Sequence, residues 1–128
     1  MLNHIHSNFI TANLLIHLFA LAHAVFVVTF KYFNLPDEIP LTILTVLMIV
    51  LVARLNDFPY DLSAILALMF CFAGFFIGTK GGELLEQYAT GFLHRYANVI
   101  MTLIVTEIVG WATYIIVQSI QPNTEKTP

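Results

Sequence analysis

Four long apolar runs, separated by short stretches with turn residues, dominate the 128-residue chain. A helix rises about 1.5 Å per residue, so about 20 residues cross a hydrocarbon layer of roughly 30 Å. Runs a little shorter or longer than this are accommodated by tilt or by local thinning of the bilayer. The pattern therefore predicts four transmembrane helices, at residues 10–33, 39–55, 62–79 and 96–120.

The composition agrees with a membrane protein. Hydrophobic residues make up 59% of the chain and charged residues 10%, and the mean hydropathy is +0.83. In a soluble domain about a quarter of the residues are charged. We therefore expect the lipid bilayer to be the main surroundings of the chain, and we expect no nucleic-acid partner.

The connections between the runs predict how the helices are arranged. Residues 34–38 and 56–61 are short and contain Pro and Asn, so consecutive helices should be antiparallel neighbours. The longest connection, residues 80–95, has apolar side chains at helical spacing and predicts a short interfacial helix; these side chains are Leu84, Leu85, Tyr88 and Phe92. The chain is thus predicted to be a single all-α, polytopic domain over residues 1–128, with a polar tail at 121–128.

Basic residues leave the orientation in the membrane open. Three of them lie on one side of the predicted topology and two on the other, which is a weak bias; they are Lys31, Lys80 and Arg95 against Arg54 and Lys126. Residues 1–9 contain no Lys or Arg, so we expect no cleaved signal peptide and a retained first span. The expected location is the cell membrane, which is the cytoplasmic membrane if the source is bacterial.

Glu107 is the acidic residue that no loop of this topology can hold, because it lies within the apolar run 99–120. In hydrocarbon a carboxyl group must be partnered, protonated or lining water. We expect it to be largely protonated near neutral pH. Counting thirteen residues from Ile10 and from Ile120 places His23 and Glu107 at the same depth, so a threonine, a backbone carbonyl or His23 is a candidate partner for the carboxyl group.

Polar residues of the first and fourth spans fall into stripes at helical spacing. In the first span the stripe has two interpretations, a helix-packing seam or a ligand or proton site; it contains Asn13, His17, Ala20, Ala24 and Lys31. The fourth span has polar side chains on opposite faces, which predicts a central helix or one at an oligomer interface; one face holds Asn98, Thr102, Thr106 and Thr113, and the other Glu107, Trp111, Tyr114 and Gln118.

The third span carries the small-residue pattern Gly74-x-x-x-Gly78-x-x-x-Gly82. Glycines four residues apart let two helix backbones approach closely, so this spacing predicts a packing seam. The pattern does not say whether the partner helix belongs to the same chain or to a second copy.

No motif in the chain predicts catalysis, a metal or a cofactor, and we expect a non-enzymatic protein. His23 and His94 lie at different depths, so a haem would need a symmetric His17–His17 or His23–His23 pair across a dimer. The pair His4-x-His6 near the start is a weak metal signal.

Two segments, 41–52 (LTILTVLMIVLV) and 106–111 (TEIVGW), resemble the four-span membrane regions of bacterial signalling proteins of the LytTR and histidine-kinase types. In those proteins the membrane region precedes an output domain, and we expect none in this chain. The resemblance implies that Glu107 and Trp111 are structural or sensory elements of a stand-alone membrane module.

Two function classes follow. In the first, the chain is a small non-enzymatic membrane module that assembles with itself or with a larger membrane partner, with a sensory or regulatory role. In the second, it is an oligomeric small transporter or channel, in which Glu107 is an intramembrane coupling site and His17 or His23 is the relay.

Overall fold

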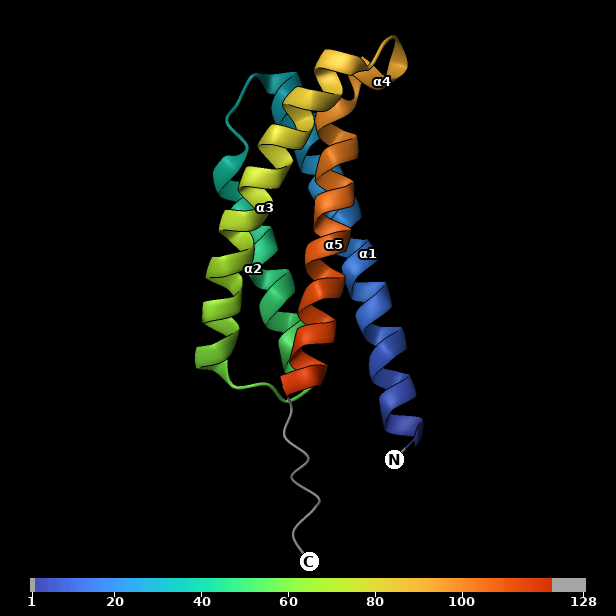
Figure 1. Ribbon diagram of the computed structural model, residues 1–128, viewed down its shortest axis with the longest axis vertical. Helices are drawn as coiled ribbons and strands as arrows, with labels where there is room; N and C mark the ends of the chain where they lie inside the picture. Colours follow the sequence, from blue (N-terminus) through green and yellow to red (C-terminus); the bar gives the residue numbers. More distant parts are fainter. Residues whose placement is uncertain (1, 121–128) are drawn as a thin grey trace, which may run out of the picture.

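The computed structural model describes the backbone of residues 2–120 and the side chains of residues 8–120, and this part of the chain is helical without strands (Figure 1). The helices are α1 (Leu2–Phe33), α2 (Glu38–Arg54), α3 (Tyr60–Tyr88), α4 (Phe92–Arg95) and α5 (Ala97–Ile120). Three stretches are long and apolar enough to cross a membrane, Asn8–Phe33, Tyr60–Tyr88 and Ala97–Ile120. The prediction of an all-α chain is confirmed for the described residues, and three of the four predicted spans coincide with helices able to cross a membrane; α2 is not among the three. The predicted tail 121–128 lies outside the described residues.

Turn residues end the helices near the predicted positions. After α1, Asn34 adopts a left-handed backbone (φ 54°), and the Leu35 N–H donates to the Phe30 carbonyl at 2.9 Å. This arrangement satisfies carbonyls at the end of the helix. Pro40 lies in the first turn of α2, where its missing N–H leaves no bond unmade. After α2, Asp57 is again left-handed (φ 52°).

The third helix differs from the prediction. It does not end at Thr79 but runs on to Tyr88, so a separate interfacial helix over residues 80–95 was the wrong expectation, and α4 has only four residues. Gly81 and Gly82 do not break the helix because α5 packs directly against them. The helix also begins one residue before Asp61, with Pro59 as its N-cap.

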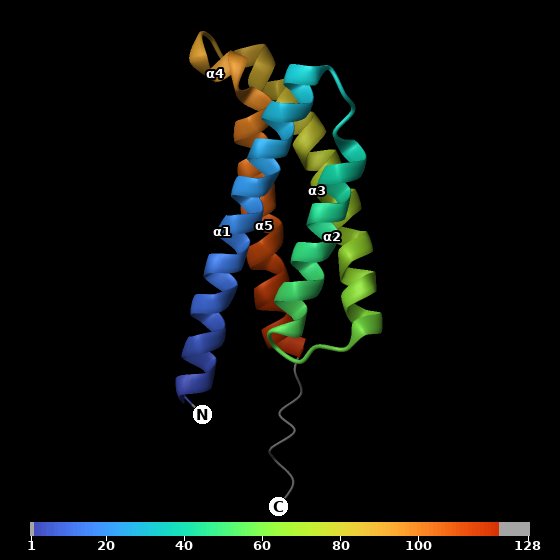
Figure 2. The ribbon, with the colours of Figure 1, turned by 180° about the vertical axis from the view of Figure 1, so that it is seen from behind.

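Helices α1, α2, α3 and α5 form an antiparallel bundle (Figures 1 and 2). The upper end, as drawn in Figure 1, holds the α1–α2 connection and α4; the lower end holds the α2–α3 connection. Helix α5 contacts α1, α2 and α3, as expected for a central helix. Helix α1 begins at Leu2, eight residues before the predicted span, and extends beyond the other helices at the lower end.

The two halves of the bundle are filled differently. The lower half contains a core of buried, mostly apolar side chains from all four long helices; they are Ala12, Ile16, Met48, Ile49, Val52, Ala67, Val109 and Tyr114. In the upper half a partly open cavity lies between the helices instead. The apolar core therefore closes the lower end of that cavity.

Candidate functional site

A cavity of about 620 Å³ lies between α1, α2, α3 and α5 in the upper half of the bundle. At the upper end it is bordered by exposed residues such as Lys31 and Glu38, and at its inner end by buried residues such as His23 and Thr106. This volume is in the range of sites that hold small molecules. The cavity thus reaches from the upper end of the bundle to a buried histidine, and it is also open at the side, where Phe75 and Thr42 in its wall are exposed.

Charged side chains at the upper end make the cavity acidic. Four carboxylates and one ammonium group line it, which leaves three negative charges while His23 is neutral; these residues are Asp37, Glu38, Glu83, Glu86 and Lys31. Lys80 binds Glu83 at 2.8 Å and offsets part of this charge from outside the lining. A cavity with low-dielectric walls focuses such a field and concentrates cations.

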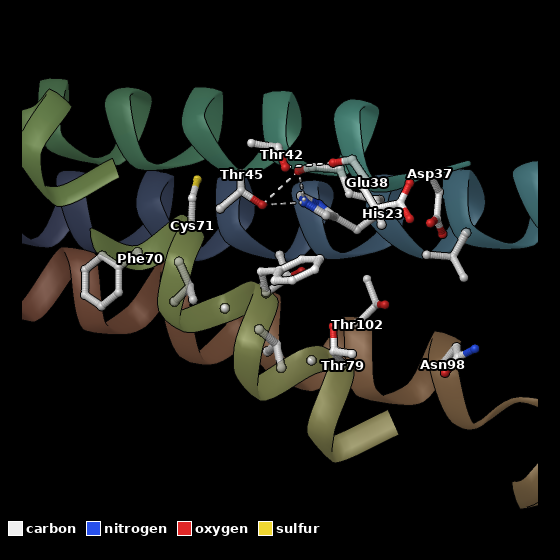
Figure 3. A pocket seen from close by; sticks show the side chains of 18 of the residues that line it. His23, Asp37, Glu38, Thr42, Thr45, Phe70, Cys71, Thr79, Asn98 and Thr102 are labelled. Atoms are coloured by element: carbon white, nitrogen blue, oxygen red, sulfur yellow. Dashed lines mark hydrogen bonds between the residues drawn. The ribbon is translucent and has the colours of Figure 1, made fainter. Parts of the chain in front are cut away.

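Hydroxyl groups line the walls between the acidic opening and His23. They come from α2, α3 and α5 and belong to Thr42, Thr45, Thr79, Thr102 and Thr106. Figure 3 shows the His23 ring reaching from α1 toward Thr45, with Thr79, Thr102 and Asn98 on the other side of the cavity. The walls can therefore donate and accept hydrogen bonds at several depths.

His23 is 2% exposed and is held at both ring nitrogens. Its Nδ1 lies 2.7 Å from the Phe19 carbonyl oxygen, which only accepts, so Nδ1–H donates. Its Nε2 lies 3.0 Å from Thr45 Oγ1 and 3.2 Å from the Leu41 carbonyl oxygen. The Thr45 hydroxyl is also within 2.9 Å of that carbonyl.

This geometry satisfies His23 in both protonation states. When the ring is neutral, the Thr45 hydroxyl donates to Nε2. When the ring is protonated, Nε2–H donates to the Leu41 carbonyl or to Thr45 Oγ1, and the hydroxyl donates to the Leu41 carbonyl at 2.9 Å. Buried polar groups are stable only with such partners. Thr45 is therefore a candidate site residue that the sequence did not reveal, since a threonine in an apolar run carries no distinctive signal.

Glu107 pairs with His17 and not with His23, the candidate partner that the depth count placed at its level. Glu107 Oε1 and His17 Nδ1 are 2.6 Å apart. The depth count assumed that α1 and α5 are level at Ile10 and Ile120, but α1 starts at Leu2 and its partner for Glu107 lies six residues earlier than predicted, about 9 Å along the axis. Neither His17 nor Glu107 lines the cavity.

Comparisons with known proteins find no match. No family model, curated protein or solved structure matches the chain. The resemblance of segments 41–52 and 106–111 to signalling membrane regions therefore stays a prediction. The chemistry of the cavity and of the His17–Glu107 pair is the basis for the function proposed below.

The glycines of the predicted seam face two different surroundings. Side chains of α5 lie 3.5 Å from a Cβ placed at Gly74 and 2.9 Å from one at Gly82, whereas nothing lies within 4 Å at Gly78, which borders the cavity. Helix α1 comes close to α5 at Gly110, where a Cβ would lie 2.7 Å from Ile16. Gly110 was not singled out from the sequence; its signal is one small residue among the large ones of the fourth span.

The remaining predicted polar residues are spread over the bundle. Asn13 is half-buried on α1, and His94 Nδ1 donates to the Glu86 carbonyl at 3.0 Å near the upper end. The side chains of His4 and His6 lie outside the described residues. Within the described part of the chain, no three His, Cys, Asp or Glu side chains are placed to hold a metal ion.

Proposed function

We propose that this chain is a multi-pass protein of the cell membrane that binds a small organic cation in its cavity. In this proposal α2 is the fourth crossing. Its 17 residues span about 25 Å, which needs modest thinning of the bilayer. Exposed Ile39, Ile43 and Leu47 give α2 an apolar outer surface suited to lipid.

One observation carries the proposal, namely an acidic cavity that is closed below by apolar packing and ends at a buried histidine. A negatively charged opening favours a cation over an anion. The hydroxyl-lined walls offer acceptors for its N–H groups. A site closed at one end suits a binding or sensory module, which takes up its solute from one side of the membrane.

Binding without catalysis is the role we propose. The Thr45 hydroxyl lies 3.0 Å from His23 Nε2, a distance at which a hydroxyl nucleophile and a base can pair. When the ring is protonated, however, this hydroxyl donates to the Leu41 carbonyl, and both groups lie on the wall of the cavity. The Thr45 hydroxyl is thus suited to support His23 with or without a proton taken up from the cavity, rather than to attack a solute.

Proton-coupled transport is a second candidate, and the two satisfied states of His23 favour it. A buried group that keeps its hydrogen bonds with and without the proton can take part in a binding cycle. The cation and the proton would compete, because both add positive charge to the same cavity. Transport would also require the apolar core below the cavity to open.

Ligand-dependent thermal unfolding tests the binding proposal. The purified chain in lipid nanodiscs is heated with small organic ammonium ions, with neutral molecules of the same shape and with organic anions. We expect stabilisation by the ammonium ions alone, because a ligand that binds only the folded state raises its stability. Equal effects of the three classes would contradict the proposal.

Uptake into liposomes separates the two candidates. A transporter moves the labelled cation in response to a pH gradient, and His23→Gln abolishes this response. A binding or sensory module shows binding without uptake.

A further inference from the structure

The His17–Glu107 pair lies on a lateral face of the bundle rather than inside it. The side chains are 56% and 31% exposed, respectively. In α5, ten residues precede Glu107 and thirteen follow it, so the pair is about 15 Å or more from either end of the helix. Exposed apolar side chains surround it on the same face, among them Leu14, Leu21 and Ile104.

Lipid cannot satisfy this pair. The bond between Nδ1 and Oε1 leaves His17 Nε2 and the second Glu107 oxygen without a hydrogen-bond partner among the described residues. Hydrocarbon offers no donor or acceptor, and ionisable groups at this depth almost always face protein or water. A lipid headgroup is too far away to reach the pair. Another protein surface must therefore cover it.

The pair is complementary to itself. Each copy presents one ring N–H donor at Nε2 and one carboxyl oxygen as acceptor, which are the groups that the other copy needs. A two-fold axis along the membrane normal brings residues of equal depth together. Two histidines and two glutamates then alternate in a closed hydrogen-bonded ring.

We propose that two copies of the chain, in the same orientation, dimerise through the α1–α5 face, with His17 Nε2 of each copy donating to Glu107 of the other. This dimer rests on the membrane insertion proposed above but does not depend on solute binding. Two interchain bonds join the copies, and the apolar side chains around the pair form the rest of the interface.

Disulfide cross-linking of the purified chain in liposomes tests the dimer, since only copies of this chain are then present. In a Cys71→Ala background, Leu21→Cys places a thiol beside the pair, and Leu68→Cys is the matched control on α3. The two leucines are 60% and 62% exposed. We expect cross-linked dimers with Leu21→Cys and at least about tenfold less product with Leu68→Cys. Equal products at both sites, or none at Leu21→Cys, would overturn the proposal.

Two further variants show whether the pair itself holds the copies together. Adding Glu107→Leu to Leu21→Cys removes both interchain bonds and should lower the cross-linked fraction about tenfold. The exchange His17→Glu with Glu107→His restores a donor and an acceptor on each copy and should restore the dimer. Full cross-linking in Glu107→Leu, or no recovery in the exchange variant, would refute this dimer. Cation binding by the unmodified chain is measured separately, so the two proposals can fail independently.

Discussion

His17 and His23 lie on the same helix, six residues apart, yet they face opposite surroundings. Six residues turn a helix by about 240° beyond a full turn, which puts the two side chains on different faces. His23 points into the cavity and bonds to α2, whereas His17 points to the lateral face and bonds to Glu107 of α5. The first is 2% exposed as a residue, and the side chain of the second is 56% exposed.

The two histidines, which the sequence offered as alternative relays for Glu107, therefore belong to separate sites: an inner site of His23 and Thr45, and an outer site of His17 and Glu107. The inner site is satisfied within one chain in either protonation state, which suits a group that gains and loses a proton. At the outer site, one polar atom of His17 and one of Glu107 have no hydrogen-bond partner among the described residues, which suits a contact with another protein. A histidine in an apolar run therefore carries no fixed meaning, and its neighbours on adjacent helices decide its role.

The largest effect is expected at the seam beside the outer site. Gly110→Leu places a side chain where Ile16 already lies, because even a Cβ would be 2.7 Å from Ile16. Overpacking of this kind destabilises by about 3 kcal/mol and pushes α1 away from α5. Unfolding in a mild detergent titrated with a denaturing one measures the change. A stability equal to that of the unmodified chain would show that α1 does not pack on α5 at Gly110.

Gly78→Leu is the counterpart at the inner site. No atom lies within 4 Å of its Cβ position, so the side chain enters the cavity instead of a packed seam. We expect the free energy of unfolding to stay within about 0.5 kcal/mol and the affinity for organic cations to fall more than about tenfold. Equilibrium dialysis in nanodiscs measures the cation affinity. An unchanged affinity would show that the cation does not bind in this cavity.

Removing the outer carboxylate should have a moderate effect. Glu107→Leu leaves His17 without its partner in lipid and is expected to lower stability by about 1–2 kcal/mol. Glu107→Gln keeps an acceptor for the ring N–H, so its cost should stay below about 1 kcal/mol. Neither variant should change cation affinity, because Glu107 does not line the cavity. A large loss of cation affinity in Glu107→Gln would show that the outer site and the cavity are coupled, contrary to the separation argued above.

The smallest effect concerns Thr45. Thr45→Val removes the hydroxyl that donates to neutral His23, while protonated His23 keeps the Leu41 carbonyl as acceptor. The variant therefore favours the protonated ring, whose charge repels a bound cation, and we expect about threefold weaker binding near neutral pH. In the unmodified chain, binding should weaken as pH falls.

The control for Thr45→Val is Thr29→Val. Thr29 donates to its own helix, at the Val25 carbonyl, and does not line the cavity. Binding of a labelled cation across a pH series should be the same for Thr29→Val and the unmodified chain. If Thr45→Val and Thr29→Val bind the cation equally at every pH, the Thr45 hydroxyl does not influence the protonation of His23.

The sequence predicted the helices well where turn residues bound the apolar run. Helices α2 and α5 begin and end within one residue of the predicted spans. Helices α1 and α3 extend beyond their apolar runs, since a helix continues into polar sequence when no residue breaks it and packing supports it. The glycines at 81 and 82 are the clearest case, because their packing on α5 is not visible in the chain.

The site was harder to predict because it depends on how the helices slide past each other. Glu107 was correctly expected to need a partner, but a shift of six residues in α1 exchanged His23 for His17. A stripe of polar residues shows which face of a helix they occupy, but not how far that helix is shifted along its axis relative to a neighbouring helix. The cavity exists partly because glycines such as Gly78 have no side chain to fill it. The contact of Thr45 with His23 could be seen only once the two helices were placed side by side.

Cys71 offers the most direct test of an acidic cavity closed at its lower end, because it is the one cysteine of the chain and lines the cavity in a half-buried position. Membrane-impermeant methanethiosulfonates of opposite charge are applied to right-side-out and inside-out vesicles. The account predicts that Cys71 reacts from the side of the α1–α2 connection alone, and about tenfold faster with the cationic reagent than with the anionic one. Equal rates for the two charges, or no reaction from either side, would contradict it.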